Sequence, residues 1–526
     1  MAFTATRTRS MPSKWLTLLA VCLGLMMLMI DTFVVNIAFP AISRGLHAGL
    51  GEAEWTVSGY VLVMGVLPIA MGRLGDLYGR RRLYLLGLAL FVGSSIACGL
   101  SQSIGALIVF RVAQGAGAAI MTPLTLSIVT HAFPAAQRGL AIGIWGGVSG
   151  LGLIAGPILG GLLVRGDNWR WIFFINVPVG LLAFVLALPF VPESRDETAP
   201  RGIDWGGLTL LSAALFLLVY GLTRANELGW GSPVLLGSLL GGAALLPVFV
   251  ALERRVQRPL IELSLFRSRT FVIACLAAFL FNAGVFGSQP YSSLLLQNTW
   301  GFSPLEAGFA FVPATALVAL MTPVSGMLGQ RLGGRLRLVM IAGSLLVAVS
   351  ALYLLRLDVR SGYADTFLPA FVIRGAGIGL FIAVTSLAVM SAVPVAKAGL
   401  ASGTLTMARQ IGTSLGVALL GGVYLNHVDG ALSGASSGAP QQAAVRRAAE
   451  HFLPAGTGAA QAAARQAIVD GFVRVSLFVA LLSVAAALAA VFIRHRAASD
   501  PAPESAPAAW MPSAVAADPL PAAVLD

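Results

Sequence analysis

Long apolar runs separated by short polar turns follow one another along most of the chain. Each run is about 20 residues or longer, which is the length of α-helix that crosses the hydrocarbon core of a bilayer. The expected fold class is therefore an all-α polytopic membrane protein. The pattern predicts fourteen transmembrane helices, at 15–38, 54–74, 83–101, 104–130, 138–164, 170–191, 205–223, 232–252, 270–296, 304–328, 338–356, 365–392, 399–425 and 471–493.

Two stretches of sequence recur eight predicted helices later. FRVAQGAGAAIMTPLT (110–125) in the fourth helix is similar to IRGAGIGLFIAVTS (373–386) in the twelfth. GRLGDLYGRRRLYL (72–85) has a weaker counterpart in GQRLGGRLRLVM (329–340). The two six-helix sets are therefore expected to be repeats, with the middle pair inserted between them. Transporters are often built from such repeats, with the substrate site between the halves.

The predicted domain organisation follows from these repeats. In chain order it comprises a cytoplasmic N-terminal segment at 1–14, a first bundle at 15–191, two inserted helices at 205–252, a second bundle at 270–493 with a long external loop at 426–470, and a cytoplasmic tail at 497–526. The external loop is rich in Ala, Gly, Ser and Gln, and we expect it to be partly helical. The tail is mostly Ala, Pro and Asp with no helical period, which predicts disorder.

Composition agrees with the membrane assignment. Of the 526 residues, 57% are hydrophobic and only 11% are charged, against about 25% charged in an average soluble protein. Lys and Arg number 34 against 22 Asp and Glu, an excess that in a soluble domain would suggest nucleic acid. Here the cations favour alternate loops by about two to one, which the positive-inside rule explains. We therefore expect no nucleic-acid partner, a cell (inner or plasma) membrane location and both termini in the cytoplasm.

Two charged residues of opposite sign are predicted at the same membrane depth. Asp31 and Arg111 both lie about 10–13 Å from the outer surface, at about 1.5 Å per helical residue. Equal depth permits an ion pair, and an unpaired charge there would be expensive. One interpretation is a static salt bridge between two helices. The other is a proton-responsive carboxylate beside a substrate cavity, with Gln114 of the same motif at this site.

The second half contains two arginines within predicted helices, Arg374 and Arg409. Neither has an evident acidic partner at depth in its own half. They are expected to bond to carbonyls or to polar groups such as Asn282, Gln289 or Gln297. Roles in substrate binding or coupling and roles in helix packing both remain open.

The loop at 72–82, GRLGDLYGRRR, is the most specific local signal. Gly72, Gly75 and Gly79 allow a tight turn, and Asp76 can accept from backbone N–H groups at a helix start. Ordinary positive-inside charge would account for Arg80 and its neighbours but not for the interleaved Gly and Asp. We therefore predict a cytoplasmic gate formed by Gly72, Asp76, Gly79 and Arg80.

The fifth predicted helix contains GIWGGVSGLGLIAGPILGG (143–161), with glycines repeatedly spaced four apart. This spacing lets another helix approach closely, and Pro157 bends the helix by freeing a backbone carbonyl. Close packing is the simpler interpretation. The further hypothesis is that this face, which includes Gly152, Gly156 and Gly160, is where the two halves meet and move.

Together these motifs resemble the major facilitator superfamily, and in particular its fourteen-span drug:proton antiporters. The resemblance covers residues 12–495 and rests mainly on IDTFVVNIAFPAI (30–42), GRLGDLYGRRR (72–82), RVAQGAGAA (111–119) and GLIAGPILGG (152–161). It implies two six-helix bundles plus two inserted helices. It also implies that Asp31 is the first-helix acid, that Arg111 takes part in proton coupling, and that Asp76 and Arg80 belong to a cytoplasmic charge network. The second loop, 329–337, lacks the acid of the first.

The function expected from the sequence is export of lipophilic, cationic drugs or antibiotics by proton antiport with alternating access. Asp31 would anchor the substrate and release it on protonation. No ATP-binding loop of the G-x-x-x-x-G-K-[ST] type is present, and we expect no cofactor, no metal and no enzymatic activity. One alternative is a narrow exporter of a single endogenous metabolite or antibiotic. Another is a transporter-like sensor or a component of an envelope assembly. We expect a monomer, and an adaptor protein remains open as a partner.

Overall fold

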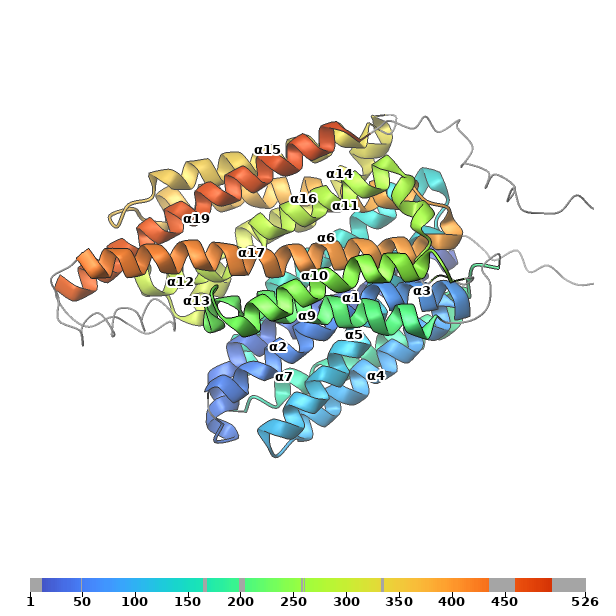
Figure 1. The fold of residues 1–526 in the computed structure, drawn as a ribbon, viewed down its shortest axis with the longest axis horizontal. Helices are drawn as coiled ribbons and strands as arrows, with labels where there is room; N and C mark the ends of the chain where they lie inside the picture. Colours follow the sequence, from blue (N-terminus) through green and yellow to red (C-terminus); the bar gives the residue numbers. More distant parts are fainter. Residues whose placement is uncertain are drawn as a thin grey trace, which may run out of the picture.

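A computed structural model describes residues 12–48, 50–163, 168–197, 204–256, 259, 261–332, 335–434 and 459–493 (Figure 1). Its regular secondary structure over these ranges is entirely helical. The predicted tail at 497–526 and most of the N-terminal segment 1–14 lie outside the described residues. Helices occupy both ends of the predicted external loop, and its residues 435–458 are not described.

The first bundle contains helices at all six predicted positions. They are α1 (Pro12–Gly45), α2 (Leu50–Val66) with α3 (Pro68–Tyr78), α4 (Arg80–Leu100), α5 (Ile104–Ala132), α6 (Ala135–Leu163), and α7 (Trp171–Phe174) with α8 (Asn176–Phe190). The inserted pair is α9 (Trp205–Leu228) and α10 (Pro233–Glu253).

The second bundle repeats the six-helix arrangement after a short 3-10 turn, η2 (Leu263–Arg267). Its helices are α11 (Arg269–Val285) with α12 (Gln289–Trp300), α13 (Pro304–Ala310) with α14 (Val312–Arg331), α15 (Leu336–Tyr353), α16 (Leu368–Ser391), α17 (Ala398–Gly434) and α19 (Ala459–Val491). Three short turns flank them, η3 (Leu354–Arg356), η4 (Tyr363–Phe367) and η5 (Val395–Lys397).

The number of helices able to span a membrane is close to the predicted fourteen. In the described residues, 12 helices are long and apolar enough to span a bilayer, or up to 13 if the bent pair α2–α3 is counted as one span. The fourteen spans expected from the sequence are therefore not all confirmed. The multi-pass helical architecture is confirmed, and α6 occupies the place of the fifth predicted span.

Two predicted spans are broken helices. The segments Trp55–Val66 and Pro68–Tyr78 meet at 52°, because Pro68 has no N–H to continue the helical ladder. The ninth predicted span is interrupted between α11 and α12. In a continuous helix the carbonyl of Val285 would accept from Gln289, but the Gln289 N–H donates to Phe286 O at 3.3 Å. Val285 O is thereby released from the helical ladder, and it accepts from Ser288 Oγ at 3.0 Å.

The two bundles touch most closely at one end of the molecule, where α1 begins. We call it the arginine-rich end, because it contains Arg73, Arg80–Arg82, Arg138 and Arg331. Here α3 packs on the start of α17, and α6 packs on α14. A Cβ on Gly72 would meet the backbone carbonyl of Gly399, and one on Gly139 would meet that of Gly326. Side chains at these positions would force the bundles apart.

The inserted helices lie against the junction of the two bundles. Figure 1 shows α9 and α10 (green) between the blue helices of the first bundle and the orange helix α17 of the second, and α9 packs on both α2 and α17. Towards α2, the ring of Tyr220 stacks on Trp55 at 6.4 Å and the Arg224 guanidinium lies 5.4 Å from the Trp55 ring. Towards α17, Leu222 and Ala225 form an apolar cluster with Ala418. The insertion is thus packed against both halves.

Candidate functional site

The centre of the first bundle contains a buried ion pair. Arg111 Nη1 on α5 lies 2.7 Å from Asp31 Oδ2 on α1, and each residue is only 1% exposed. The contact that equal membrane depth allowed is therefore present. Arg111 Nε also donates to the backbone carbonyl of Thr56 at 3.0 Å, and its guanidinium lies 4.3 Å from the Tyr60 ring. Arg111 thus connects α1, α2 and α5.

Two side-chain amides complete the surroundings of Asp31. Gln114 Nε2 donates to Asp31 Oδ1 at 2.9 Å, and Gln114 Oε1 accepts from Arg111 Nη1 at 2.8 Å. Asn176 Nδ2, at the start of α8, donates to the same Oδ1 at 2.9 Å and to Ser95 Oγ on α4 at 3.0 Å. Both carboxylate oxygens of Asp31 are therefore engaged inside the first bundle.

Asn176 was not among the predicted site residues. It stands within the apolar run WIFFINVPVG (171–180), where it is the only polar side chain. Such an isolated amide in a membrane segment is expensive unless it is bonded, and that signal could have identified it. The structure places it 1% exposed beside Asp31.

The second bundle contains a buried arginine without an acid. Arg374 on α16 is 5% exposed, and its Nη2 donates to Ser288 Oγ at 2.6 Å and to the carbonyl of Val285. The expected carbonyl partner is present, but the expected amide partners Asn282, Gln289 and Gln297 do not bond to Arg374. The break between α11 and α12 explains the difference, because it frees the Val285 carbonyl and turns Ser288 toward α16.

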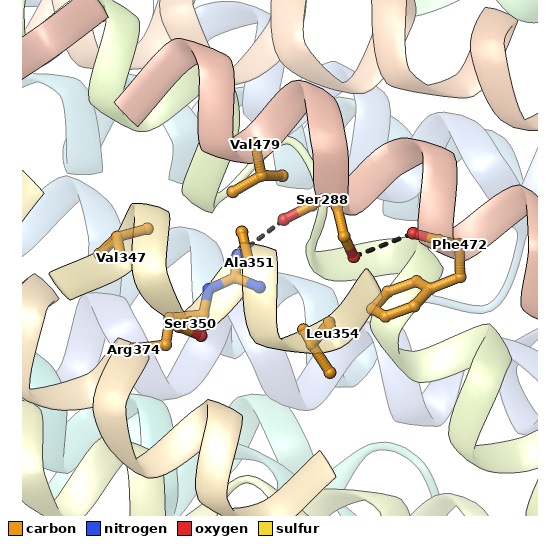
Figure 2. A pocket seen from close by; sticks show the side chains of 9 residues that line it. Ser288, Val347, Ser350, Ala351, Leu354, Arg374, Phe472 and Val479 are labelled. Atoms are coloured by element: carbon orange, nitrogen blue, oxygen red, sulfur yellow. Dashed lines mark hydrogen bonds between the residues drawn. The ribbon is translucent and has the colours of Figure 1, made fainter. Parts of the chain in front are cut away.

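Arg374 also borders a small pocket inside the second bundle (Figure 2). The pocket lies among α15, α16, α19 and the break after α11. It is lined by Ser288, Val347, Ser350, Ala351, Leu354, Arg374, Phe472, Ser476 and Val479. The hydroxyls of Ser350 and Ser476 already donate to backbone carbonyls, of Ala370 at 2.7 Å and Phe472 at 2.9 Å. The site is therefore an internal polar contact among helices of one bundle.

Arg409 on α17 lies nearer to the other bundle. Its Nη2 donates to Ser386 Oγ at 2.9 Å and to Ile382 O at 3.4 Å, both on α16. The side chain of Arg409 is partly exposed, unlike that of Arg374. The structure therefore separates the two arginines that the sequence treated alike.

The predicted gate residues Asp76 and Arg80 do lie together, and both side chains are fully buried. Arg80 Nη2 lies 2.6 Å from Asp76 Oδ1 and donates to Ala396 O at 2.6 Å. Asp76 accepts from Gly399 N at 2.9 Å and from Leu400 N at 2.8 Å. Asp76 thus caps a helix start, as predicted, but the helix is α17 of the opposite bundle.

The three glycines of this loop do not all form the tight turn that the sequence predicts. Only Gly79 has a positive φ, of 115°, a backbone conformation that favours glycine. Gly72 and Gly75 lie within α3. There they permit close approach, of Gly72 to Gly399 and of Gly75 to the Leu124 side chain.

A second ionic contact crosses the same end and was not predicted. Glu262, in the segment that leads from the inserted helices to α11, pairs with Lys397 of the second bundle. Its other oxygen lies 3.7 Å from Arg73 Nη1 on α3 of the first bundle. Arg73 is only 2% exposed. The inserted segment therefore supplies an acid between cations of the two halves.

The glycine-rich helix α6 presents two different faces. A Cβ on Gly143 would lie 2.6 Å from Pro323 Cα, and one on Gly147 would lie 2.9 Å from Ala319 O, both on α14 of the second bundle. This face does lie at the junction of the halves.

The predicted motif glycines are on the other face. A Cβ on Gly152 would lie 2.5 Å from Met29 Cβ, and one on Gly156 would lie 2.6 Å from Phe33 Cβ, both on α1. The five residues from Gly147 to Gly152 turn the helix by about 500°, which places Gly152 about 140° around the axis from Gly147. Gly152 and Gly156 therefore pack within their own bundle, on either side of Asp31. Gly160 is buried farther along α6, and Pro157 lies between them in the same helix.

Comparison with known proteins agrees with this architecture. The sequence profile of the Major Facilitator Superfamily matches residues 21–417. The chain belongs to the major facilitator superfamily. Members of this superfamily are transporters and not enzymes, so the chain is a multi-pass membrane transporter of small molecules.

Several curated members of the superfamily are similar over most of their length. The chain is 38% identical over 512 residues to the tetracenomycin C resistance and export protein of Streptomyces glaucescens, covering 94% of each. It is 38% identical to the multidrug resistance protein Stp of Mycobacterium tuberculosis, covering 78% of this chain and 76% of that protein. It is 33% identical to the puromycin resistance protein of Streptomyces alboniger, covering 78% and 81%.

Solved structures of the superfamily share the fold at low sequence identity. A proton:xylose symporter, XylE, is 14% identical with a TM-score of 0.59, covering 91% of this chain and 95% of that one. A bacterial homologue of the human lysosomal transporter Spinster is 20% identical with a TM-score of 0.54, covering 92% and 98%. These likenesses confirm the superfamily fold.

Proposed function

We propose that this transporter exports lipophilic small molecules of the drug or antibiotic type by proton antiport with alternating access. The names of its relatives, which are resistance, export and multidrug proteins, support the choice of export. The observation that carries the coupling mechanism is the buried pair of Asp31 and Arg111 at 2.7 Å. A membrane-buried carboxylate is expensive and is by default a functional hypothesis.

In this proposal the proton and the substrate act at different places. Asp31 is enclosed by Arg111, Gln114 and Asn176, and both its oxygens are engaged. Protonation would weaken its attachment to Arg111 and so loosen α1 against α5 and α8. Because α1 packs on one face of α6 and α14 packs on the other, a shift of α1 reaches the junction of the bundles. Coupling is then transmitted through packing, and Asp31 need not contact the substrate.

The orientation belongs to the same proposal. The arginine-rich end is assigned to the cytoplasm, because alternate loops collect cations on that side. Both termini would then be cytoplasmic, in the plasma or inner membrane. The contacts of Asp76 and Arg80 with the start of α17 would close the cytoplasmic side in this conformation.

Ligand-induced proton release tests the proposal directly. Detergent-purified protein in weakly buffered solution would be titrated with a panel of dyes and biocides while pH is recorded. The wild type is expected to release protons with at least one compound, and Asp31→Asn is expected to release none and to lose pH-driven efflux. Asp365→Asn, at an exposed aspartate, is the matched control. Equal proton release by Asp31→Asn and wild type would remove Asp31 from the mechanism.

The breadth of the substrate range needs a separate measurement. The same panel applied to efflux-deficient cells that express the protein distinguishes multidrug export from export of a single metabolite or antibiotic. Protection against several unrelated compounds supports the former, and protection against one supports the latter. Transport by purified protein in liposomes, without partners, would dismiss a sensor or an adaptor-dependent component.

A further inference from the structure

The buried charges of the two bundles do not balance. Asp31 is matched by Arg111 in the first bundle. In the second, neither Arg374 nor Arg409 forms an ion pair with any Asp or Glu that the structure describes. An unpaired guanidinium away from water is costly. Its field attracts anions and repels cations.

Arg409 retains free hydrogen-bonding capacity. Both of its hydrogen bonds, to Ser386 Oγ and Ile382 O, use Nη2. Nε and Nη1 donate to no partner within the described part of the chain. A guanidinium has five N–H donors, so three remain available. Donors of this kind favour the oxygens of carboxylates and similar anions.

Arg409 also lies beside the junction of the two bundles. Its neighbour Gln410 approaches α2, since a Cβ on Gly65 would lie 3.4 Å from Gln410 Cγ. Its acceptor Ile382 approaches α6, since a Cβ on Gly146 would lie 3.4 Å from Ile382 Cγ2. Arg409 is roughly 16 Å along α17 from its first residue, at about 1.5 Å per residue, which is near mid-membrane. If a partly exposed arginine at this depth faced lipid, placing its charge there would carry a high free-energy cost.

Arg374 is less suited to contact a transported molecule. It is 5% exposed and points into the pocket of Figure 2, among helices of its own bundle. It adds to the positive field of the second bundle without being reachable from the junction. The two arginines therefore contribute in different ways.

We propose that the exported lipophilic molecule carries an acidic group, and that Arg409 binds this group through Nε and Nη1. The inference rests on the proposed export function and names its substrate class. It replaces the cationic substrate expected from the sequence. A cationic substrate would need an Asp31 carboxylate that is free to bind it, whereas both Asp31 oxygens are engaged by neighbouring side chains.

Two xanthene dyes of opposite charge provide the test. Fluorescein is an anion and pyronin is a cation on a similar ring system. Export of each would be measured in proteoliposomes under an imposed pH gradient, for wild type, Arg409→Gln, Arg409→Lys and Arg356→Gln. The last changes an exposed arginine and is the matched control. Thermal unfolding of each purified variant checks that it folds.

The wild type is expected to export fluorescein in preference to pyronin. Arg409→Gln should lower fluorescein export by about tenfold, the loss of one charge-assisted contact, and Arg409→Lys should retain part of it. Preferential export of pyronin, or unchanged fluorescein export by a folded Arg409→Gln, overturns the substrate class while leaving proton-driven export in place. If the wild type exports neither dye under the pH gradient, the proposed substrate class fails, while export itself is decided separately by the wider panel of dyes and biocides.

Discussion

Arg111 and Arg374 stand on the fourth helix of their respective bundles, and each bonds to the first helix of its own bundle, but only Arg111 meets a carboxylate there. Arg111 pairs with Asp31 at 2.7 Å, whereas Arg374 bonds to the Ser288 hydroxyl at 2.6 Å and to a backbone carbonyl. Both repeated halves thus contain a buried arginine on their fourth helix, and they differ in the group that balances its charge. A carboxylate therefore balances the buried guanidinium in the first half, and no carboxylate among the described residues does so for Arg374 in the second.

The geometry of Arg111, and not only its charge, should matter for coupling. Arg111→Lys keeps the positive charge, but one ammonium cannot reach Asp31, Gln114 and Thr56 O together. We expect pH-driven efflux to fall by about tenfold or more. Arg356→Lys, at an exposed site, should have no effect. Normal efflux by Arg111→Lys would show that charge alone suffices.

Asn176 should stabilise the acid site. Asn176→Ala removes the donor to Asp31 and to Ser95 Oγ and leaves buried acceptors short of a partner. The expected cost is about 1–3 kcal/mol of unfolding free energy, seen as a lower unfolding temperature in detergent. Asn168→Ala, at an exposed position, is the control. Equal unfolding temperatures for the wild type and Asn176→Ala would contradict the role.

Gly72 should be intolerant of even a methyl group. A Cβ there would overlap the carbonyl of Gly399 in the other bundle, so Gly72→Ala should open the arginine-rich end and lower efflux by about tenfold. Spin labels at the exposed positions Tyr78 and Leu332 would report longer distances between the halves. Gly93→Ala is the control, because nothing lies within 4 Å of its added Cβ. An unchanged distance distribution in Gly72→Ala would count against close contact at this end.

Glu262 should help to close the same end. Glu262→Gln weakens its contacts with Lys397 and Arg73, each worth about 1 kcal/mol or less because they are partly screened. The same spin labels should show a shift of about two- to fivefold toward the open population. High salt should reduce the difference from wild type. Glu197→Gln, at an exposed glutamate, should change nothing, and a salt-independent effect of Glu262→Gln would argue against an ionic origin.

Helix positions and the central ion pair could be predicted because they depend on local properties of the chain. Apolar run length places helices, and a fixed rise per residue places Asp31 and Arg111 at one depth. The partners of Arg374 could not be predicted in this way. They depend on where the helix breaks between Val285 and Gln289. Pro290 favours a break here but does not fix the residue at which α11 ends, and a break changes which side chains face a neighbouring helix.

The faces of α6 and the role of Glu262 were missed for a related reason. Spacing of four residues identifies glycines that permit close packing, but it does not say which helix approaches. Gly147 faces α14 and Gly152 faces α1 because of how three helices cross. Glu262 lies in a connecting segment, and its neighbours Arg73 and Lys397 come from opposite halves of the sequence. Such contacts are set by the assembled bundles.

The inserted helices make the two lateral borders of the transporter unequal. On one border α9 covers the line where α2 and α17 face each other. On the other, α6 meets α14, and in the described part of the chain neither α9 nor α10 packs on these two helices. An amphiphile dissolved in a membrane leaflet therefore encounters a shielded border and a bare one. Sideways entry from lipid is then expected at the α6–α14 border, so the insertion would give this transporter one preferred flank for collecting molecules from the bilayer.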